Sequence, residues 1–74
     1  MINLTGVIFD GANLKNANFS GFNLSNTSFK KANLQGANLE NCNLANVDLT
    51  DANLEDINLT GVKKEEGRRK REEV

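Results

Sequence analysis

The chain has 74 residues, a length that allows one domain with a marginal hydrophobic core. Its single cysteine, Cys42, and its lack of histidine exclude an internal disulfide and remove the usual zinc sites and histidine-based acid–base sites. The formal net charge of −1 argues against a protein-wide basic surface, so direct binding of nucleic acid is not expected.

The N-terminal residues Met1–Gly6 lack a basic segment followed by an apolar stretch, which a secretory signal requires. No part of the sequence stays apolar over the length needed to cross a bilayer. A lone cysteine also fits a reducing compartment. We therefore expect a cytoplasmic protein that binds no membrane, metal or cofactor.

A five-residue unit repeats twelve times without interruption from Ile2 to Gly61. The centre of each unit is Leu or Phe: Leu4, Phe9, Leu14, Phe19, Leu24, Phe29, Leu34, Leu39, Leu44, Leu49, Leu54 and Leu59. The residue before the centre is Asn in nine units, and the residue two positions after it is Gly, Asn or Asp in eleven, with Lys31 as the exception. Because one unit is too small to bury its own apolar side chains, the units must stack on one another.

Neither a helix nor a flat strand accommodates this spacing. On a helix, a step of five residues rotates each apolar centre by about 140° and distributes the centres around the cylinder. On a strand, an odd period sends successive centres to opposite faces. We therefore expect three residues of extended chain in each unit, followed by a corner at which Gly, Asn and Asp tolerate a left-handed backbone.

The exceptions to the Asn rule indicate how many units make one coil. Only Ile8, Ser28 and Asp48 replace Asn before a centre, and they are twenty residues apart. A coil of four units places all three in one vertical column. The same stacking places Phe9 beside Phe29, and it places Cys42 in an apolar column, where a free thiol is most often inert packing.

Several units, among them Ala32-Asn33-Leu34-Gln35-Gly36 and Ala52-Asn53-Leu54-Glu55-Asp56, resemble the A(D/N)LXX signature of pentapeptide-repeat proteins. The resemblance covers residues 2–62 and implies an all-β fold. It implies a right-handed quadrilateral β-helix, a β-solenoid of about three coils with four repeats each. The outward Asn residues would then form three columns, in which we expect the amides to hydrogen-bond along the stack as ladders.

The side without Asn is the first candidate for an interaction face, because departures from a scaffold's rule tend to lie at functional sites. Its candidate residues are Ile8, Asp10, Ser28, Lys30, Lys31, Asp48, Thr50 and Asp51. The coil ends are a second candidate, because an uncovered coil exposes apolar side chains and unpaired backbone groups. At the C-terminal end the candidate contact residues are Ile57, Leu59 and Val62.

The repeat ends before residues 63–74, which carry six basic and four acidic side chains. This segment is polar on all sides and contains Gly67, so we expect a charged tail that is disordered or a frayed helix. The sequence thus divides into a repeat domain, residues 1–62, and a tail, residues 63–74.

No catalytic arrangement is found in the sequence, since no base is placed to activate a nucleophile, and the protein is not expected to be an enzyme. We expect a structural or protein-interaction module that binds a protein partner or associates with itself through its coil ends. The alternative, implied by the resemblance alone, is a mimic of DNA that binds DNA gyrase or a related topoisomerase.

Overall fold

The computed structural model describes residues 1–63, and within them the chain forms no helix. Its β-structure consists of isolated parallel bridges, each one residue long: Asn3↔Asn23, Ile8↔Ser28, Asn13↔Asn33, Asn18↔Asn38, Asn23↔Asn43, Ser28↔Asp48, Asn33↔Asn53, Asn38↔Asn58 and Asn43↔Lys63. Every bridge joins residues twenty positions apart, which confirms the spacing of four repeats predicted from the exceptions to the Asn rule.

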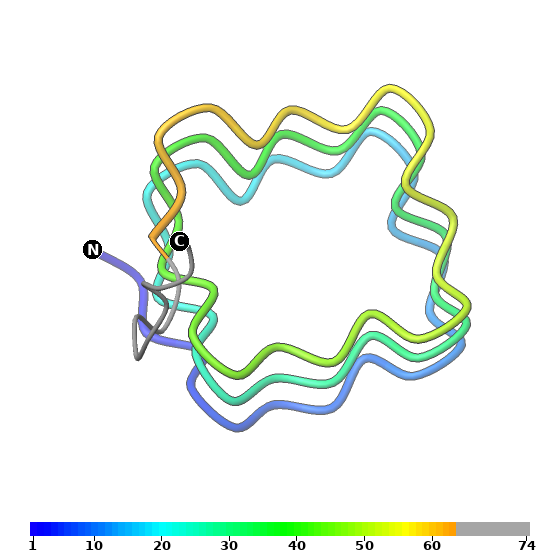
Figure 1. Cartoon of the computed structure of the whole chain (residues 1–74), viewed down its shortest axis with the longest axis horizontal. Coiled ribbons are helices and arrows are strands. Elements are labelled where there is room, and N and C mark those ends of the chain that lie inside the picture. The colour runs from blue at the N-terminus through cyan, green and yellow to red at the C-terminus, as the bar shows by residue number, and fades with distance from the viewer. Residues whose placement is uncertain (64–74) are drawn as a thin grey trace, which may run out of the picture.

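The chain follows a four-sided path, and stretches twenty residues apart lie one above another (Figure 1). We call residues 2–21 the N-terminal layer, 22–41 the middle layer and 42–61 the C-terminal layer. Val62 and Lys63 continue beyond the C-terminal layer, where Lys63 forms a bridge with Asn43.

All twelve corners have the left-handed backbone that the sequence predicted. The residue two positions after each centre has a φ between 60° and 79°, whether it is Gly, Asn, Asp or Lys. This conformation is unfavourable for a residue with a Cβ, and least so for Asn and Asp, while Gly adopts it freely. Because the chain turns at every fifth residue, pairing between layers is interrupted, and the extended segments are single bridge residues rather than the three-residue strands expected.

The same three backbone hydrogen bonds join neighbouring layers in each repeat. In the repeat centred on Phe9, the N–H groups of Phe9 and Gly11 donate upward to the carbonyls of Ser28 and Lys30, at 2.7 and 2.8 Å. The N–H of Ser28 donates downward to the carbonyl of Val7, at 3.1 Å. Each layer therefore has a direction, with two donors and one acceptor per repeat facing one way.

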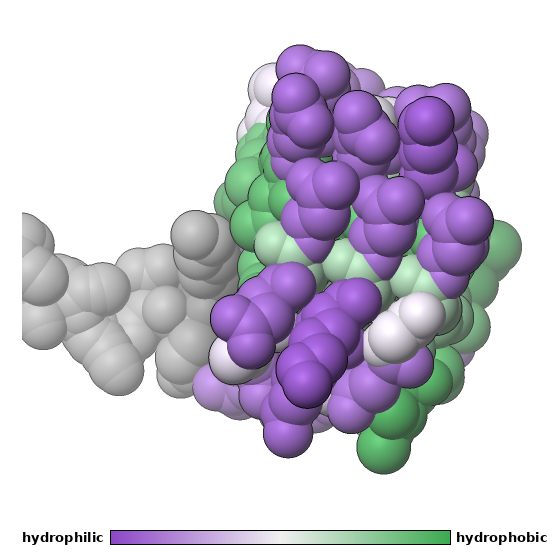
Figure 2. All heavy atoms as spheres, turned by 90° about the vertical axis from the view of Figure 1, so that its right-hand side faces the viewer, coloured by the Kyte–Doolittle hydropathy of each residue, from purple (hydrophilic) through white to green (hydrophobic). Residues whose placement is uncertain are grey.

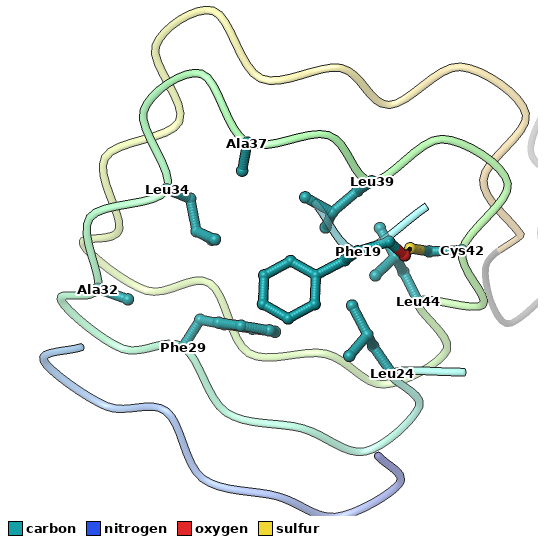
Figure 3. Packing of buried hydrophobic residues seen from close by; sticks show 9 residues of the cluster. All are labelled: Phe19, Leu24, Phe29, Ala32, Leu34, Ala37, Leu39, Cys42 and Leu44. Carbon is teal, nitrogen blue, oxygen red and sulfur yellow. Dashed lines mark hydrogen bonds between the residues drawn. The ribbon is translucent and has the colours of Figure 1, made fainter. Parts of the chain in front are cut away.

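Leu, Phe and small side chains fill the interior of the stack (Figure 3). The rings of Phe9 and Phe29 are stacked with centroids 5.0 Å apart, as predicted from their shared column. Phe19 meets both rings edge-on, with centroids 6.0 and 6.2 Å away. Phe22, which occupies a position usually held by a small residue, is partly buried against Phe19.

Burial falls from the middle of the stack toward both ends. The centres of the middle layer, Leu24, Phe29, Leu34 and Leu39, are fully buried. Leu4, Phe9 and Leu14 near one end and Leu49, Leu54 and Leu59 near the other are only partly covered. In Figure 2, hydrophilic side chains cover the side wall in rows, while hydrophobic atoms reach the surface at both ends. Full burial of a centre thus comes with a neighbouring layer on both sides, and Phe19 of the N-terminal layer is buried as well because the rings of Phe9, Phe22 and Phe29 surround it.

Candidate interaction face and layer ends

The structure brings the three residues that break the Asn rule into one column. Ile8 pairs with Ser28, and Ser28 pairs with Asp48. We call this side of the stack, with the eight residues predicted for it, the Ile8 face.

The ordinary Asn residues act within their own repeat. In all nine repeats with Asn before the centre, the side-chain Oδ1 accepts a hydrogen bond from the backbone N–H two residues later, at 2.9 to 3.2 Å. Within residues 1–63 no hydrogen bond joins Asn side chains of neighbouring layers. The predicted ladders are therefore wrong, because each Oδ1 is already directed along its own chain in an Asx turn.

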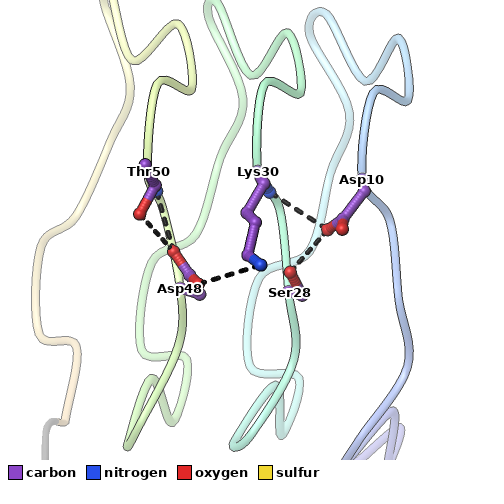
Figure 4. Close-up of polar contacts among 5 residues, drawn as sticks. All are labelled: Asp10, Ser28, Lys30, Asp48 and Thr50. Atoms are coloured by element: carbon purple, nitrogen blue, oxygen red, sulfur yellow. Dashed lines mark hydrogen bonds and ion pairs between the residues drawn. The ribbon is translucent and has the colours of Figure 1, made fainter.

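On the Ile8 face, the Asp10 side chain accepts a backbone N–H of a different layer. Position 28 carries Ser in place of Asn, and the N–H of Lys30 donates to Oδ1 of Asp10, 3.2 Å away (Figure 4). The hydroxyl of Ser28 donates to the same oxygen. Asp10 thus compensates for the missing Asn at position 28, a role that its place after Phe9 did not reveal, because it depends on the layer above.

Asp48 carries a carboxylate in place of the Asn amide, but it accepts the same hydrogen bond from the N–H two residues later. Its Oδ1 accepts hydrogen bonds from the hydroxyl and the backbone N–H of Thr50, at 2.6 and 3.0 Å. Its Oδ2 lies 3.9 Å from Nζ of Lys30. The hydroxyl of Thr50, then its N–H, and more weakly Lys30, lower the pKa of the Asp48 carboxyl from its ordinary value. Because the pair is exposed, it contributes little to stability.

Ile8 is the residue of this face that nothing in the structure explains. Its side chain is 71% exposed. It has no polar atom to accept the N–H of Asp10, which is the only N–H directly after a centre that has no acceptor among residues 1–63. The sequence thus places an exposed apolar side chain where Asn would complete a hydrogen bond.

The two remaining predicted residues of the face, Lys31 and Asp51, lie at corners. Both have positive φ, 61° and 60°. Both are exposed, and no hydrogen bond involves either side chain within the described part of the chain. The N–H of Lys31 donates to the carbonyl of Thr50 at 2.9 Å.

The predicted contact residues at the C-terminal end differ in exposure. Ile57 and Val62 are half-buried and pack against the core cluster, whereas Leu59 is 36% exposed. No contact residues were predicted at the opposite end, where Ile2 is 52% exposed. The signal was available, because the first layer of a stack has no neighbour on one side.

Other chemical groups of the described residues offer no built site. Within residues 1–63 no three His, Cys, Asp or Glu side chains are grouped to hold a metal ion. Cys42 is buried, its thiol donates to the carbonyl of Phe19 at 2.9 Å, and burial raises the thiol's pKa. The same residues contain no helix with the length and apolar composition to cross a membrane. The predicted tail lies outside the described residues from position 64 onward.

Comparison with known proteins agrees with this architecture. Residues 2–67 match the sequence profile described as the pentapeptide repeat region. The chain belongs to the pentapeptide-repeat family, whose members form right-handed quadrilateral β-helices. No curated protein sequence matches it.

Two solved structures are similar. The pentapeptide repeat protein Rfr23 from the cyanobacterium Cyanothece 51142 is 41% identical with a TM-score of 0.83, over 86% of this chain and 44% of that one. HetL from the cyanobacterium Nostoc, described as involved in the regulation of heterocyst differentiation, is 37% identical with a TM-score of 0.50, over 89% of this chain and 33% of that one. The chain therefore spans less than half the length of either relative.

Proposed function

We propose that this chain is a non-catalytic protein-interaction module of about three coils with four repeats each, and that the Ile8 face contacts a protein partner. The observation that carries the proposal is the exposed Ile8 side chain. It occupies a position where nine of twelve repeats use Asn for a backbone hydrogen bond. With Ile at this position, the scaffold forgoes that hydrogen bond. A single exposed apolar residue beside charged groups suits the centre of a small polar interface.

The polar residues of the face support a partner with both charge signs. Asp10, Lys30 and Asp48 form an alternating series along the column, and Lys30 lies between the two carboxylates in Figure 4. Their mutual contacts hold these side chains in place before a partner binds, which lowers the entropy lost on association. The same pairing works against DNA mimicry, because a DNA mimic needs a continuous row of unpaired negative charge.

The variant Ile8→Asn tests this proposal without destabilising the fold. Asn would supply the missing acceptor for the N–H of Asp10, so the variant is expected to be at least as stable as the parent chain. The Ile8→Leu variant is the control, because it keeps an apolar side chain of equal size.

The measurement is quantitative capture from an extract of the source cells with the parent chain and both variants immobilised at equal density. A partner of the Ile8 face is retained by the parent and by Ile8→Leu and is depleted at least tenfold on Ile8→Asn. Equal recovery on all three would reject the face. DNA gyrase enriched on all three, with inhibition of supercoiling by the free chain, would instead support the alternative function.

A further inference from the structure

The hydrogen-bonding groups at the two ends of the stack are complementary. Six N–H groups of residues 47–61, which form three sides of the C-terminal layer, have no acceptor among residues 1–63: those of Leu49, Asp51, Leu54, Asp56, Leu59 and Gly61. The carbonyls that accept from the next layer elsewhere in the stack lie two residues before each centre, and three of these accept nothing from residues 1–63 here: those of Val47, Ala52 and Ile57. This end therefore offers two donors for every acceptor.

The N-terminal layer offers the reverse. In its first three repeats, the three N–H groups directly before a centre, the kind that donates to the preceding layer elsewhere in the stack, have no acceptor within residues 1–63: those of Asn3, Ile8 and Asn13. The carbonyls directly before and directly after each centre accept from the preceding layer elsewhere in the stack, and six of them receive no hydrogen bond from the described residues here: those of Asn3, Thr5, Ile8, Asp10, Asn13 and Lys15. Six donors and three acceptors at one end thus match six acceptors and three donors at the other.

From this match we propose that the chain binds a second copy of itself head to tail, with the N-terminal layer of one copy on the C-terminal layer of the next. This contact continues the parallel bridges of the stack and satisfies nine backbone hydrogen bonds on three sides. Two C-terminal ends brought together form at most six of these hydrogen bonds, because each end has only three acceptors. Two N-terminal ends also form at most six, because each has only three donors. The polarity of the layers thus selects head-to-tail association over a two-fold dimer.

The apolar residues at the ends support the same contact. Ile2 and Leu59 are 52% and 36% exposed, and the end centres Leu4, Phe9, Leu49 and Leu54 are partly covered. A second layer would cover these side chains as the neighbouring layers cover Leu34 and Leu39, which are fully buried.

The start of the next turn fixes where the second copy begins. Val62 and Lys63 already lie above Cys42 and Asn43, since the N–H of Lys63 donates to the carbonyl of Cys42 at 2.8 Å. The first repeat of the second copy therefore follows them and lies above the repeat centred on Leu49. Asp10 of the second copy then lies above Glu55, as Glu55 lies above Gln35 within the chain, where the two side chains are 3.5 Å apart.

Because one copy uses different surfaces on its two sides, both ends of a dimer stay open and assembly continues. In sedimentation equilibrium, the weight-average mass is expected to rise with concentration beyond that of two chains. A mass that levels off at two chains would reject the head-to-tail contact. A chain that remains monomeric up to its solubility limit would also reject it.

Two end variants test the polarity. Leu59→Lys blocks the C-terminal end and Ile2→Lys blocks the N-terminal end, and both replace partly exposed side chains. Each variant alone is expected to be monomeric, while an equimolar mixture forms a dimer through the two unblocked ends. Dimers of either variant alone would overturn the proposal. Glu40→Lys, in the middle layer away from both ends, is the matched control and leaves assembly unchanged, and far-UV circular dichroism confirms that each variant is folded.

A third variant tests the placement of the second copy. In the proposed placement, the carboxylate of Glu55 lies beside that of Asp10 in the next copy, and the two negative charges repel. Glu55→Lys makes this pair attractive, so association is expected to strengthen at least threefold at low salt. Weaker association would overturn this placement. It would indicate that the second copy is rotated by one side of the stack, so that its Lys15, rather than its Asp10, lies beside Glu55.

Discussion

The carboxylate of Asp10 accepts a hydrogen bond from the backbone N–H of Lys30 in the next layer, 3.2 Å away. In nine other repeats an Asn of the same repeat serves such an N–H, and on the Ile8 face the acceptor comes from twenty residues earlier in the chain. The scaffold therefore tolerates a break in its sequence rule when a neighbouring layer supplies the missing group.

Substitution of Asp10 by Ala should destabilise the chain by about 1 kcal/mol, because the N–H of Lys30 and the hydroxyl of Ser28 both lose their acceptor. Ser28→Asn in the same background should restore most of this loss, since the new Asn side chain would accept the N–H of Lys30 within its own repeat. Urea denaturation of the four chains of this cycle measures the coupling. Additive effects of the two substitutions would contradict the compensating role of Asp10.

Replacement of Lys31 by Asn should stabilise the chain by about 0.5–1 kcal/mol, because Asn adopts a left-handed backbone at lower cost. Lys31 has a φ of 61° at a corner where every other repeat has Gly, Asn or Asp. The control is Lys15→Asn, an exposed lysine that does not have a positive φ. An equal gain from both substitutions in thermal or urea denaturation would show that loss of a lysine charge, rather than corner strain, is responsible.

Two corner glycines should respond differently to Ala. Gly36→Ala and Gly21→Ala both place a Cβ at a positive φ, which costs about 1 kcal/mol after the gain from a less flexible unfolded chain. A Cβ at Gly21 meets no atom within 4 Å, whereas at Gly36 it collides with the side-chain oxygen of Asn16. Gly36→Ala should therefore be clearly more destabilising in urea denaturation.

The double variant Asn16→Gly with Gly36→Ala separates steric collision from backbone strain. It removes the side chain that the new Cβ meets and should bring the cost of Gly36→Ala down to that of Gly21→Ala. If the two alanine variants are equally stable from the start, Asn16 moves aside freely and the collision is unimportant.

The stability of the chain should fall as the pH rises above 9.0, the ordinary pKa of the Cys42 thiol, because the folded chain holds a proton that the unfolded chain releases first. Burial raises the pKa of the Cys42 thiol above its ordinary value of 9.0. The contribution is fully present below the ordinary pKa and is lost as the pH rises through the folded pKa. The variant Cys42→Ala is the control, and the difference in its urea midpoint from the parent chain should shrink with increasing pH.

Slow alkylation of the folded chain at neutral pH is a second consequence of the buried thiol. Iodoacetamide should modify Cys42 only at the rate at which the fold opens, and complete labelling should follow addition of denaturant. Rapid labelling under native conditions would show that the thiol is accessible.

The repeat could be interpreted without a structure because it is a local rule. Every unit has Leu or Phe at its centre, and eleven of the twelve have Gly, Asn or Asp two positions later, where all twelve residues have a positive φ. The period of twenty residues was also accessible, since Ile8, Ser28 and Asp48 recur at that spacing. The direction in which the Asn side chains hydrogen-bond was predicted wrongly, because a side-chain oxygen can reach either its own repeat or the next layer.

Three features of the protein follow from the order of its residues alone: the apolar residues form an inner lining, the chain turns after every repeat, and one side differs from the other three. These features depend on residues at most a few positions apart, or on a regular spacing. The folded chain was needed to show that Asp10 accepts the N–H of Lys30, that the N–H of Asp10 beside Ile8 has no acceptor among residues 1–63, and that the two ends of the described stack carry complementary donors and acceptors. Those relationships depend on which groups of one layer point toward the next, and this direction is set by the three-dimensional path of the backbone.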